Sequence, residues 1–260
     1  MQIFLKLVLA LALFGPAVWA QQSKPLSDSE LAAITARGRL LIEYDAASWH
    51  ATDAVLALKP AQGRVARYIA RKTDTGWVVA FGGFSETKDA FLIVYEAAQS
   101  SNPSREFSVK INDPPEKDTG FFYVAAKGIQ LSLENAHLEK RPYNMYVLPL
   151  DSGQFYVYVL PAQTVASVYP LGGDTRFLLS SDGSKIVETR PLHRTILEVT
   201  HSGPAGKKPA GGFHTHVLTD TPEDTDVFHV LRQTPPLPEF VGTRNGNYEV
   251  ETGGTIKRIK

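Results

Sequence analysis

Short strand-type runs separated by turn residues recur along this chain, and they limit its fold more than any other feature of the sequence. An Asp-Ser-Gly loop at 151–153 divides two such runs, residues 145–150 and 154–160, and places glycine where a three-residue hairpin needs a positive φ. Asn245 and Gly246 form another strong hairpin signal. Because hairpins join antiparallel strands, the sequence predicts a largely antiparallel sheet.

Helices are expected beside these strands. Ser27 begins a capping box, which predicts a helix that ends at Gly38. Apolar spacing predicts a second helix over about residues 46–58 and a third over 120–138. A threonine cap, a first-turn proline and several acids predict a fourth over residues 222–232. The expected fold class is therefore α+β, mostly antiparallel sheet with three or four helices.

The domain organisation is less strongly indicated. Residues 97–115 are polar and contain prolines, so they are expected to form a loop. A boundary near this loop would divide the chain into an N-terminal α+β region, residues 21–118, and a C-terminal α+β region, residues 119–260. A single large domain remains an alternative, because the length suits either arrangement.

The first twenty residues have the pattern of a secretion signal. Lys6 supplies a positive start, and residues 7–14 form an apolar run too short to span a bilayer. Val18 and Ala20 put small residues where signal peptidase reads them, so we expect cleavage after Ala20 and a periplasmic or secreted protein. An uncleaved anchor helix is the alternative.

Composition excludes several classes of protein. The 27 basic and 27 acidic residues balance, so no basic face of the kind that binds nucleic acid is expected. The chain contains no cysteine, which excludes a disulfide framework, thiolate chemistry and a lipid-anchoring cysteine. No segment after the signal is apolar enough to predict a membrane span. Stability must therefore come from an ordinary hydrophobic core.

A histidine-rich segment is where the sequence indicates chemistry. Five of the seven histidines lie between residues 193 and 229. His214 and His216 are two positions apart on an expected strand, so both imidazoles would project from one face. Asp226 follows in the first turn of the expected helix. Two imidazoles and one carboxylate form a ligand set for catalytic zinc. The other histidines of the segment are expected at the surface or in structural roles.

The order His-x-His, then a proline and an aspartate at a helix start, then two strands, resembles the JAMM metalloprotease family, also called Mov34/MPN. The resemblance covers residues 212–250 and implies that His214, His216 and Asp226 occupy zinc-ligand positions. It also implies cleavage of peptide or isopeptide bonds. This chain has Glu223 where the family has a serine after the proline. Glu223 is therefore a candidate catalytic proton shuttle or a fourth ligand, and the family's upstream glutamate has no recognisable counterpart.

Two functions remain open at this point. One is an exported protein that binds a protein, a peptide or an envelope component through a degenerate JAMM-like region. The other is a secreted zinc-dependent hydrolase that uses His214, His216 and Asp226. The convergence of these three side chains within metal-ligand distance is the observation that bears most directly on the second.

Overall fold

The protein is described here by a computed structural model that covers residues 26–100, 106–201 and 209–259. The expected signal peptide and its cleavage after Ala20 lie outside the described residues and stay predictions. Within the described ranges, no helix combines the length and the apolar character that a membrane crossing needs.

The architecture is α+β, as predicted, with sheets that are mostly antiparallel. The three described helices are α1 (Asp28–Ala57), α2 (Phe121–Asn135) and α3 (Asp224–Arg232). The strands of the first half are β1 (Arg67–Thr73), β2 (Gly76–Phe84), β3 (Phe91–Gln99), β4 (Phe107–Asp118), β5 (Tyr143–Pro149), β6 (Phe155–Pro161) and β7 (Val168–Leu171). The remaining strands are β8 (Thr175–Leu179), β9 (Ile186–Pro191), β10 (Leu197–Thr200), β11 (Gly212–Thr215), β12 (Glu239–Thr243), β13 (Gly246–Val250) and β14 (Ile256–Ile259).

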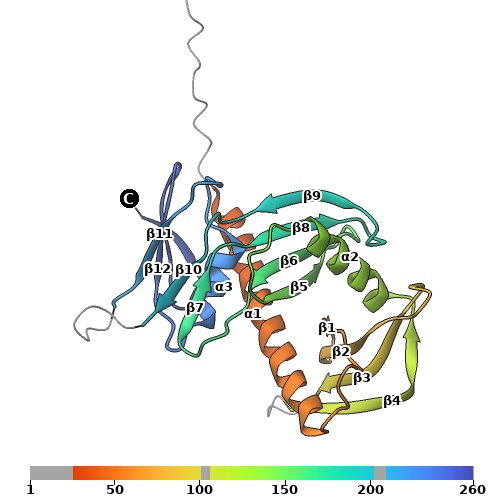
Figure 1. Ribbon diagram of the computed structural model, residues 1–260. Coiled ribbons are helices and arrows are strands. Elements are labelled where there is room, and N and C mark those ends of the chain that lie inside the picture. Colours follow the sequence, from red (N-terminus) through yellow and green to blue (C-terminus); the bar gives the residue numbers. More distant parts are fainter. Residues whose placement is uncertain (1–25, 101–105, 202–208, 260) are drawn as a thin grey trace, which may run out of the picture.

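The strands form three four-stranded sheets and one two-stranded sheet. Their orders are β1-β2-β3-β4, β5-β6-β8-β9, β11-β12-β13-β14 and β10-β7. Every pair is antiparallel except β11 with β12, which is parallel. The predicted hairpins at residues 151–153 and at Asn245 connect β5 to β6 and β12 to β13. Figure 1 shows α1 running through the middle of the molecule, with the β11–β14 sheet beside one end of it.

Helix α1 corrects the prediction that Gly38 ends a first helix. The predicted capping box at Ser27 is present, but the helix continues through Gly38 to Ala57 and includes the second predicted helix. A Cβ atom at Gly38 would overlap Val227 of α3. Glycine is therefore needed here for close contact between two helices, and its low helix propensity is outweighed by that packing.

Strand β4 corrects the prediction of a loop over residues 97–115. Residues 107–118 pair with β3 along most of their length. The strand lies at the edge of its sheet, and most of its side chains are exposed or half-buried. Edge strands tolerate polar residues and prolines because one side of the backbone has no partner strand. The polar composition therefore indicated exposure, not the absence of a strand.

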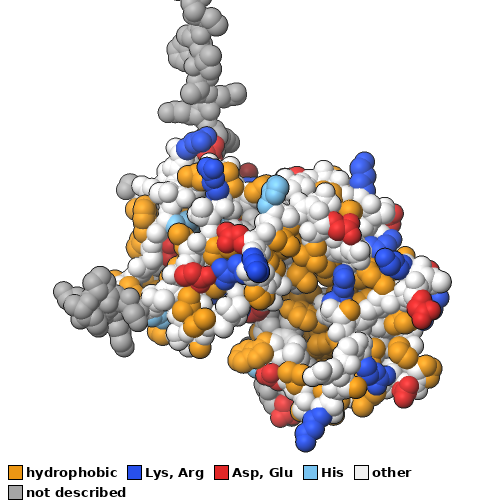
Figure 2. Space-filling model, in the orientation of Figure 1, with side chains coloured by type: hydrophobic (Ala, Val, Ile, Leu, Met, Phe, Trp, Pro, Cys, Tyr) orange, Lys and Arg blue, Asp and Glu red, His pale blue; other side chains and the backbone are white. Residues whose placement is uncertain are grey.

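The larger hydrophobic core joins residues from both sides of the expected domain boundary. Leu41 and Phe91 belong to the same buried cluster as Phe177 and Phe228. A smaller cluster packs α1 and α3 against β12, β13 and β14. The expected division of the chain into two regions at residue 118 stays a prediction. On the face shown in Figure 2, acidic and basic side chains are interspersed.

Candidate metal centre

Strand β11 and the first turn of α3 bring two parts of the histidine-rich segment together. His214 lies on β11 opposite Val241, and the N–H of His216 donates to the carbonyl of Gly242 at 2.8 Å. The ladder thus continues to His216, and the two imidazoles turn to the same side. Asp226 lies in the first turn of α3, where its Oδ2 accepts the N–H of Glu223 at 2.7 Å.

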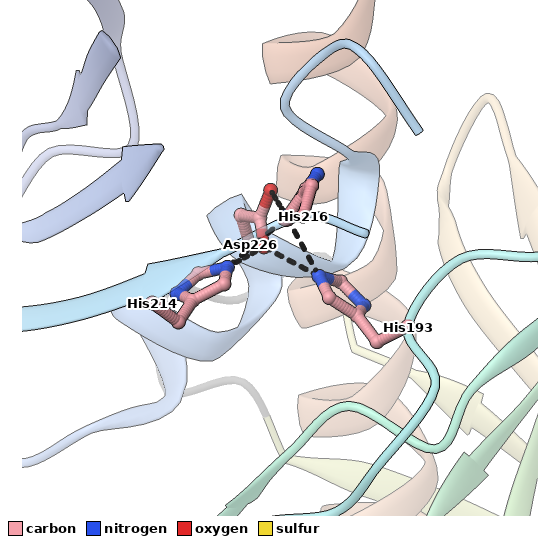
Figure 3. A group of neighbouring side chains, drawn as sticks. All are labelled: His193, His214, His216 and Asp226. Atoms are coloured by element: carbon pink, nitrogen blue, oxygen red, sulfur yellow. Dashed lines mark hydrogen bonds and ion pairs between the residues drawn. The ribbon is translucent and has the colours of Figure 1, made fainter. Parts of the chain in front are cut away.

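A third imidazole completes the group. His193 lies between β9 and β10, and its Nε2 is 2.9 Å from Nε2 of His216. Nε2 of His214 is 3.0 Å from the same atom of His216. Oδ1 of Asp226 is 3.0 Å from Nε2 of His193 and 3.1 Å from Nε2 of His214. Figure 3 shows the three rings and the carboxylate directed toward one point.

The second ring nitrogen of each imidazole, Nδ1, has an oxygen atom as its hydrogen-bond partner. Nδ1 of His193 lies 2.7 Å from Asp174, and Nδ1 of His214 lies 2.8 Å from Glu239. Nδ1 of His216 lies 2.7 Å from the carbonyl of Thr221. A carbonyl can only accept, and ionised carboxylates also only accept, so each Nδ1 carries the proton in the neutral ring. Partners of this kind orient metal-binding histidines in proteins.

The three Nε2 lone pairs and the Asp226 carboxylate therefore face one another. Neutral nitrogen acceptors at these separations repel unless a cation or a proton lies between them. Zinc–ligand bonds of about 2.0–2.1 Å would put neighbouring donors roughly 3.3 Å apart. The distances in this cluster are close to that value, and all four ligand atoms lie within 4.8 Å of one another. The four residues are thus buried and close enough to hold a metal ion.

The electrostatics of the cluster agree with a site for a cation. Burial raises the pKa of Asp226, but the nearby imidazoles outweigh burial and hold it well below its usual value. Burial lowers the pKa of His193, yet the charges of Asp174 and Asp226 raise it well above its usual value. Burial also lowers the pKa of His214, but its hydrogen bonds to Asp226 and Glu239 outweigh burial and raise that pKa to about 9. Without a metal the cluster therefore retains protons, which a metal would displace.

One side of the cluster opens onto a cavity of about 720 Å³, which we call the imidazole cavity. His193, His214 and His216 are among its lining residues and Asp226 is not, although the side chain of His216 is itself fully buried. Its other walls are mostly apolar and include Leu171, Leu192, Leu197, Phe213 and Val217. An ion at the centre would thus be reached from the imidazole side, opposite the carboxylate.

Glu223 occupies a different environment from the one expected for a catalytic or ligating residue. Its Oε1 lies 2.6 Å from Nη2 of Arg190, and it is not among the four converging residues. Burial raises the pKa of Glu223 to about 7. The structure therefore brings His214, His216 and Asp226 together, and it places the Glu223 carboxylate on an arginine.

His193 is the residue that the sequence reasoning missed, because it was expected at the surface or in a structural role. The clustering of five histidines was the only signal for it, since no motif surrounds it. The two remaining histidines of the segment lie outside the group. His201 contacts Gln233 at 2.8 Å, and His229 is buried with no described partner for its Nε2.

The chain was compared with protein-family models, with curated proteins and with solved structures, and none of them matches it. The resemblance of residues 212–250 to the JAMM family therefore stays a proposal.

Proposed function

We propose that this protein binds one divalent transition-metal ion, zinc by its ligand set, and is a metal-dependent hydrolase outside the cytoplasm. The observation that carries the proposal is the orientation of three Nε2 lone pairs and one carboxylate toward a single point. Imidazole nitrogens and a carboxylate oxygen are common zinc ligands. His193, His214, His216 and Asp226 would hold the ion.

The imidazole cavity supports a catalytic role for the metal centre. Catalytic zinc sites keep one coordination position for water or substrate, whereas structural sites are closed by protein ligands. The side chains of His193 and His214 are slightly exposed beside the cavity, so the ion would be approached from that side. When bound, such an ion lowers the pKa of a coordinated water to about 7 and supplies a nucleophile at neutral pH.

The walls of the cavity indicate the kind of substrate. Leu197, Phe213 and Val217 present apolar surface beside the imidazoles, and Phe213 is 69% exposed. Arg194 is the cavity's exposed cation and has no ion pair within the described residues. A substrate with an apolar group and a carbonyl or carboxylate fits this lining. The JAMM resemblance adds peptide or isopeptide bonds as the proposed bond type.

A hydrolase also needs a group that transfers protons. Among the described residues that line the imidazole cavity, none is acidic. Glu223 is paired with Arg190, so a role as proton shuttle requires it to exchange that partner.

A second function is favoured by the number of protein ligands. Four protein donors can close a tetrahedral zinc site and leave a structural ion without chemistry. Phe213, Val217 and Leu218 form exposed apolar surface near the centre, which suits contact with a partner protein. In that case the protein binds a protein, peptide or envelope component and the ion stabilises its binding surface.

Metal content and cobalt spectroscopy separate these outcomes. Purified protein should contain close to one equivalent of metal by elemental analysis, and exposure to zinc should raise its melting temperature. Replacement by Co²⁺ then reports the coordination number in the visible absorption spectrum. If the centre is open to the cavity, acetohydroxamate should change that spectrum, and the zinc form should cleave casein or an isopeptide-linked reporter.

Each negative result has a distinct meaning in this experiment. A spectrum of four-coordinate Co²⁺ that acetohydroxamate leaves unchanged would contradict the hydrolase and favour the structural ion. Protein that takes up no metal, and whose melting temperature zinc does not change, would contradict the metal centre itself. The His201→Ala variant is the matched control, because this histidine lies outside the cluster.

A further inference from the structure

A second cavity, of about 690 Å³, lies along one side of α1 and shares no lining residue with the imidazole cavity. We call it the α1 cavity. Residues 42–52 of α1 form one wall, and residues 163–167, which follow β6, form another. The end of α3 closes it at Arg232. The two cavities lie near different ends of β7, so the second is a separate candidate site.

The α1 cavity contains a carboxylate and a guanidinium that are near each other but incompletely paired. Oδ1 of Asp45 accepts the hydroxyl of Tyr146 at 2.7 Å. Oδ2 of Asp45 lies 3.7 Å from Nε of Arg232, which is too long for a hydrogen bond. Within the described residues, the guanidinium of Arg232 makes no hydrogen bond and lies over the ring of Phe228, 5.5 Å from its centroid. Both groups therefore retain hydrogen-bonding capacity toward the cavity.

A buried hydroxyl in the same wall also lacks a partner. Ser48 is 4% exposed, and its Oγ has no hydrogen-bond partner among the described residues. Leaving a buried hydroxyl unpaired costs about 1–3 kcal/mol, and this oxygen is closed to solvent, so a ligand in the cavity would contact it only after the Ser48 side chain turns. Gln163 lines the opposite wall, and its amide nitrogen donates to the carbonyl of Val165 at 3.2 Å.

Aromatic side chains stand beside these polar groups. Trp49 lies on the same side of α1 as Asp45 and is 64% exposed, which is unusual for so large a side chain. Tyr68 and Tyr169 also line the cavity. Burial raises the pKa of Tyr68 to about 12, so its hydroxyl stays protonated and can donate. An aromatic ring can cover the apolar face of a ligand whose edges form hydrogen bonds.

We propose that the α1 cavity binds an uncharged polyhydroxylated ligand of the carbohydrate class. Hydroxyl groups both donate and accept, so neighbouring hydroxyls can bridge Asp45 and Arg232, whose side chains are partly exposed. The C–H face of a sugar ring packs on Trp49. This binding function is independent of the metal centre and does not rest on the proposed hydrolase.

The charges of the cavity favour a neutral ligand over an ionic one. An anion drawn to Arg232 would meet the Asp45 carboxylate at short distance, and a cation drawn to Asp45 would meet the guanidinium. Asp45 and Arg232 are the charged side chains that line the cavity within the described residues. Phosphorylated ligands, which usually need several cationic or N–H donors, are therefore disfavoured.

The test uses the purified full protein and four oligosaccharide probes. Cellotetraose, maltotetraose and the tetramer of N-acetylglucosamine are neutral, and the tetramer of galacturonic acid is the charged comparison. Binding is followed by tryptophan fluorescence and isothermal titration calorimetry. In the mature protein expected after cleavage at Ala20, which lacks Trp19, the tryptophans are Trp49, which is exposed, and Trp77, which is 7% exposed, so a change in emission reports mainly on the cavity.

At least one neutral probe should bind saturably, with a Kd of about 1 mM or lower. Trp49→Ala and Arg232→Gln should each weaken that binding at least tenfold. The control Leu56→Ala changes an exposed residue of the same helix that does not line the cavity, and it should leave binding unchanged. Melting curves establish that the variants are folded, and removal of metal with a chelator should not alter the Kd.

Three results would overturn this proposal. The first is the absence of saturable binding for every neutral probe up to concentrations on the order of 10 mM. The second is binding of the galacturonic acid tetramer alone. The third is binding of a neutral probe that Trp49→Ala and Arg232→Gln leave unchanged while both variants are folded, because the sugar would then occupy another surface.

Discussion

Nδ1 of His193 lies 2.7 Å from Oδ1 of Asp174, and the same oxygen accepts the backbone N–H of His193 at 3.1 Å. Asp174 is only 2% exposed. This double contact orients the one imidazole of the cluster that comes from outside residues 212–226. The carboxylate therefore helps to position the fourth donor of the candidate metal centre, although it does not face the metal position itself.

Weakening this contact should weaken metal binding. We expect Asp174→Asn to lower zinc affinity about 10–100-fold, because an amide accepts less strongly than a carboxylate and holds the ring less firmly. Competition with a chromophoric chelator measures the affinity. Asp220→Asn, at a half-buried position outside the cluster, is the control and should have no effect. Equal affinities for both variants would contradict the positioning role of Asp174.

Removing the imidazole itself should have a larger effect. We expect His193→Ala to reduce zinc affinity by more than the loss expected for Asp174→Asn, since a direct donor is lost. His201→Ala leaves the four donors in place and should retain normal affinity. Elemental analysis after dialysis against a weak chelator distinguishes the two variants. If His193→Ala keeps its metal, the ion is held by His214, His216 and Asp226 alone.

Metal affinity should depend strongly on pH. Metal binding requires neutral imidazoles, and the pKa of His214 is raised to about 9 in the cluster, while that of His193 is also raised. Zinc must therefore displace protons at every pH below about 9. The apparent affinity should fall by up to about tenfold per pH unit for each displaced proton as pH decreases from 9 to 6. Chelator competition at four pH values tests this, and a flat profile would contradict it.

Asp224 should be essential for stability. Its carboxylate is fully buried, and it accepts from Arg37, Tyr158 and Arg176 at 2.7–2.9 Å. Removing one partner of a buried pair costs about 3–5 kcal/mol, because the other charge is left without compensation. We expect Asp224→Ala to lower the free energy of unfolding by that amount in a denaturant titration.

The matched control for Asp224 is an ion pair at the surface. Glu43 pairs with Lys72, and both side chains are about half exposed. Exposed pairs contribute roughly 0.2–1 kcal/mol, so Glu43→Ala should change stability by no more than that. A similar loss in both variants would show that the buried network around Asp224 is not a special source of stability.

Glu223 should make the protein less stable as pH rises. Its pKa is about 7 in the folded protein, above the ordinary value of 4.5, so the folded state binds the proton more tightly than the unfolded state. The free energy of unfolding therefore decreases between pH 4.5 and 7, by up to about 3 kcal/mol, and does not recover above pH 7.

Substitution of Glu223 tests both this effect and its proposed catalytic role. Glu223→Gln should remove that part of the pH dependence and should leave metal affinity unchanged, because its carboxylate pairs with Arg190 and is not among the four converging donors. Glu188→Gln, at an exposed strand position, is the control. Loss of metal from Glu223→Gln would identify a ligand, whereas loss of hydrolysis with metal retained would identify a proton shuttle.

Sequence patterns predicted the elements that depend on neighbouring residues. Hairpin turns at 151–153 and at Asn245, and the capping box at Ser27, follow from local backbone chemistry and are present. The spacing of His214 and His216 decided that their rings share one side, because alternate residues of a strand point the same way. These features need no knowledge of distant parts of the chain.

Other features depend on contacts between residues that are distant in the chain, and the sequence patterns did not predict them. Gly38 continues a helix because α3 packs against it, and residues 107–118 form a strand because β3 offers an edge. His193 joins the cluster through the fold between β9 and β10, and Asp174 orients it from 19 positions away. Local sequence patterns do not predict such contacts, because the free energy that stabilises these contacts comes from packing and from the burial of paired charges.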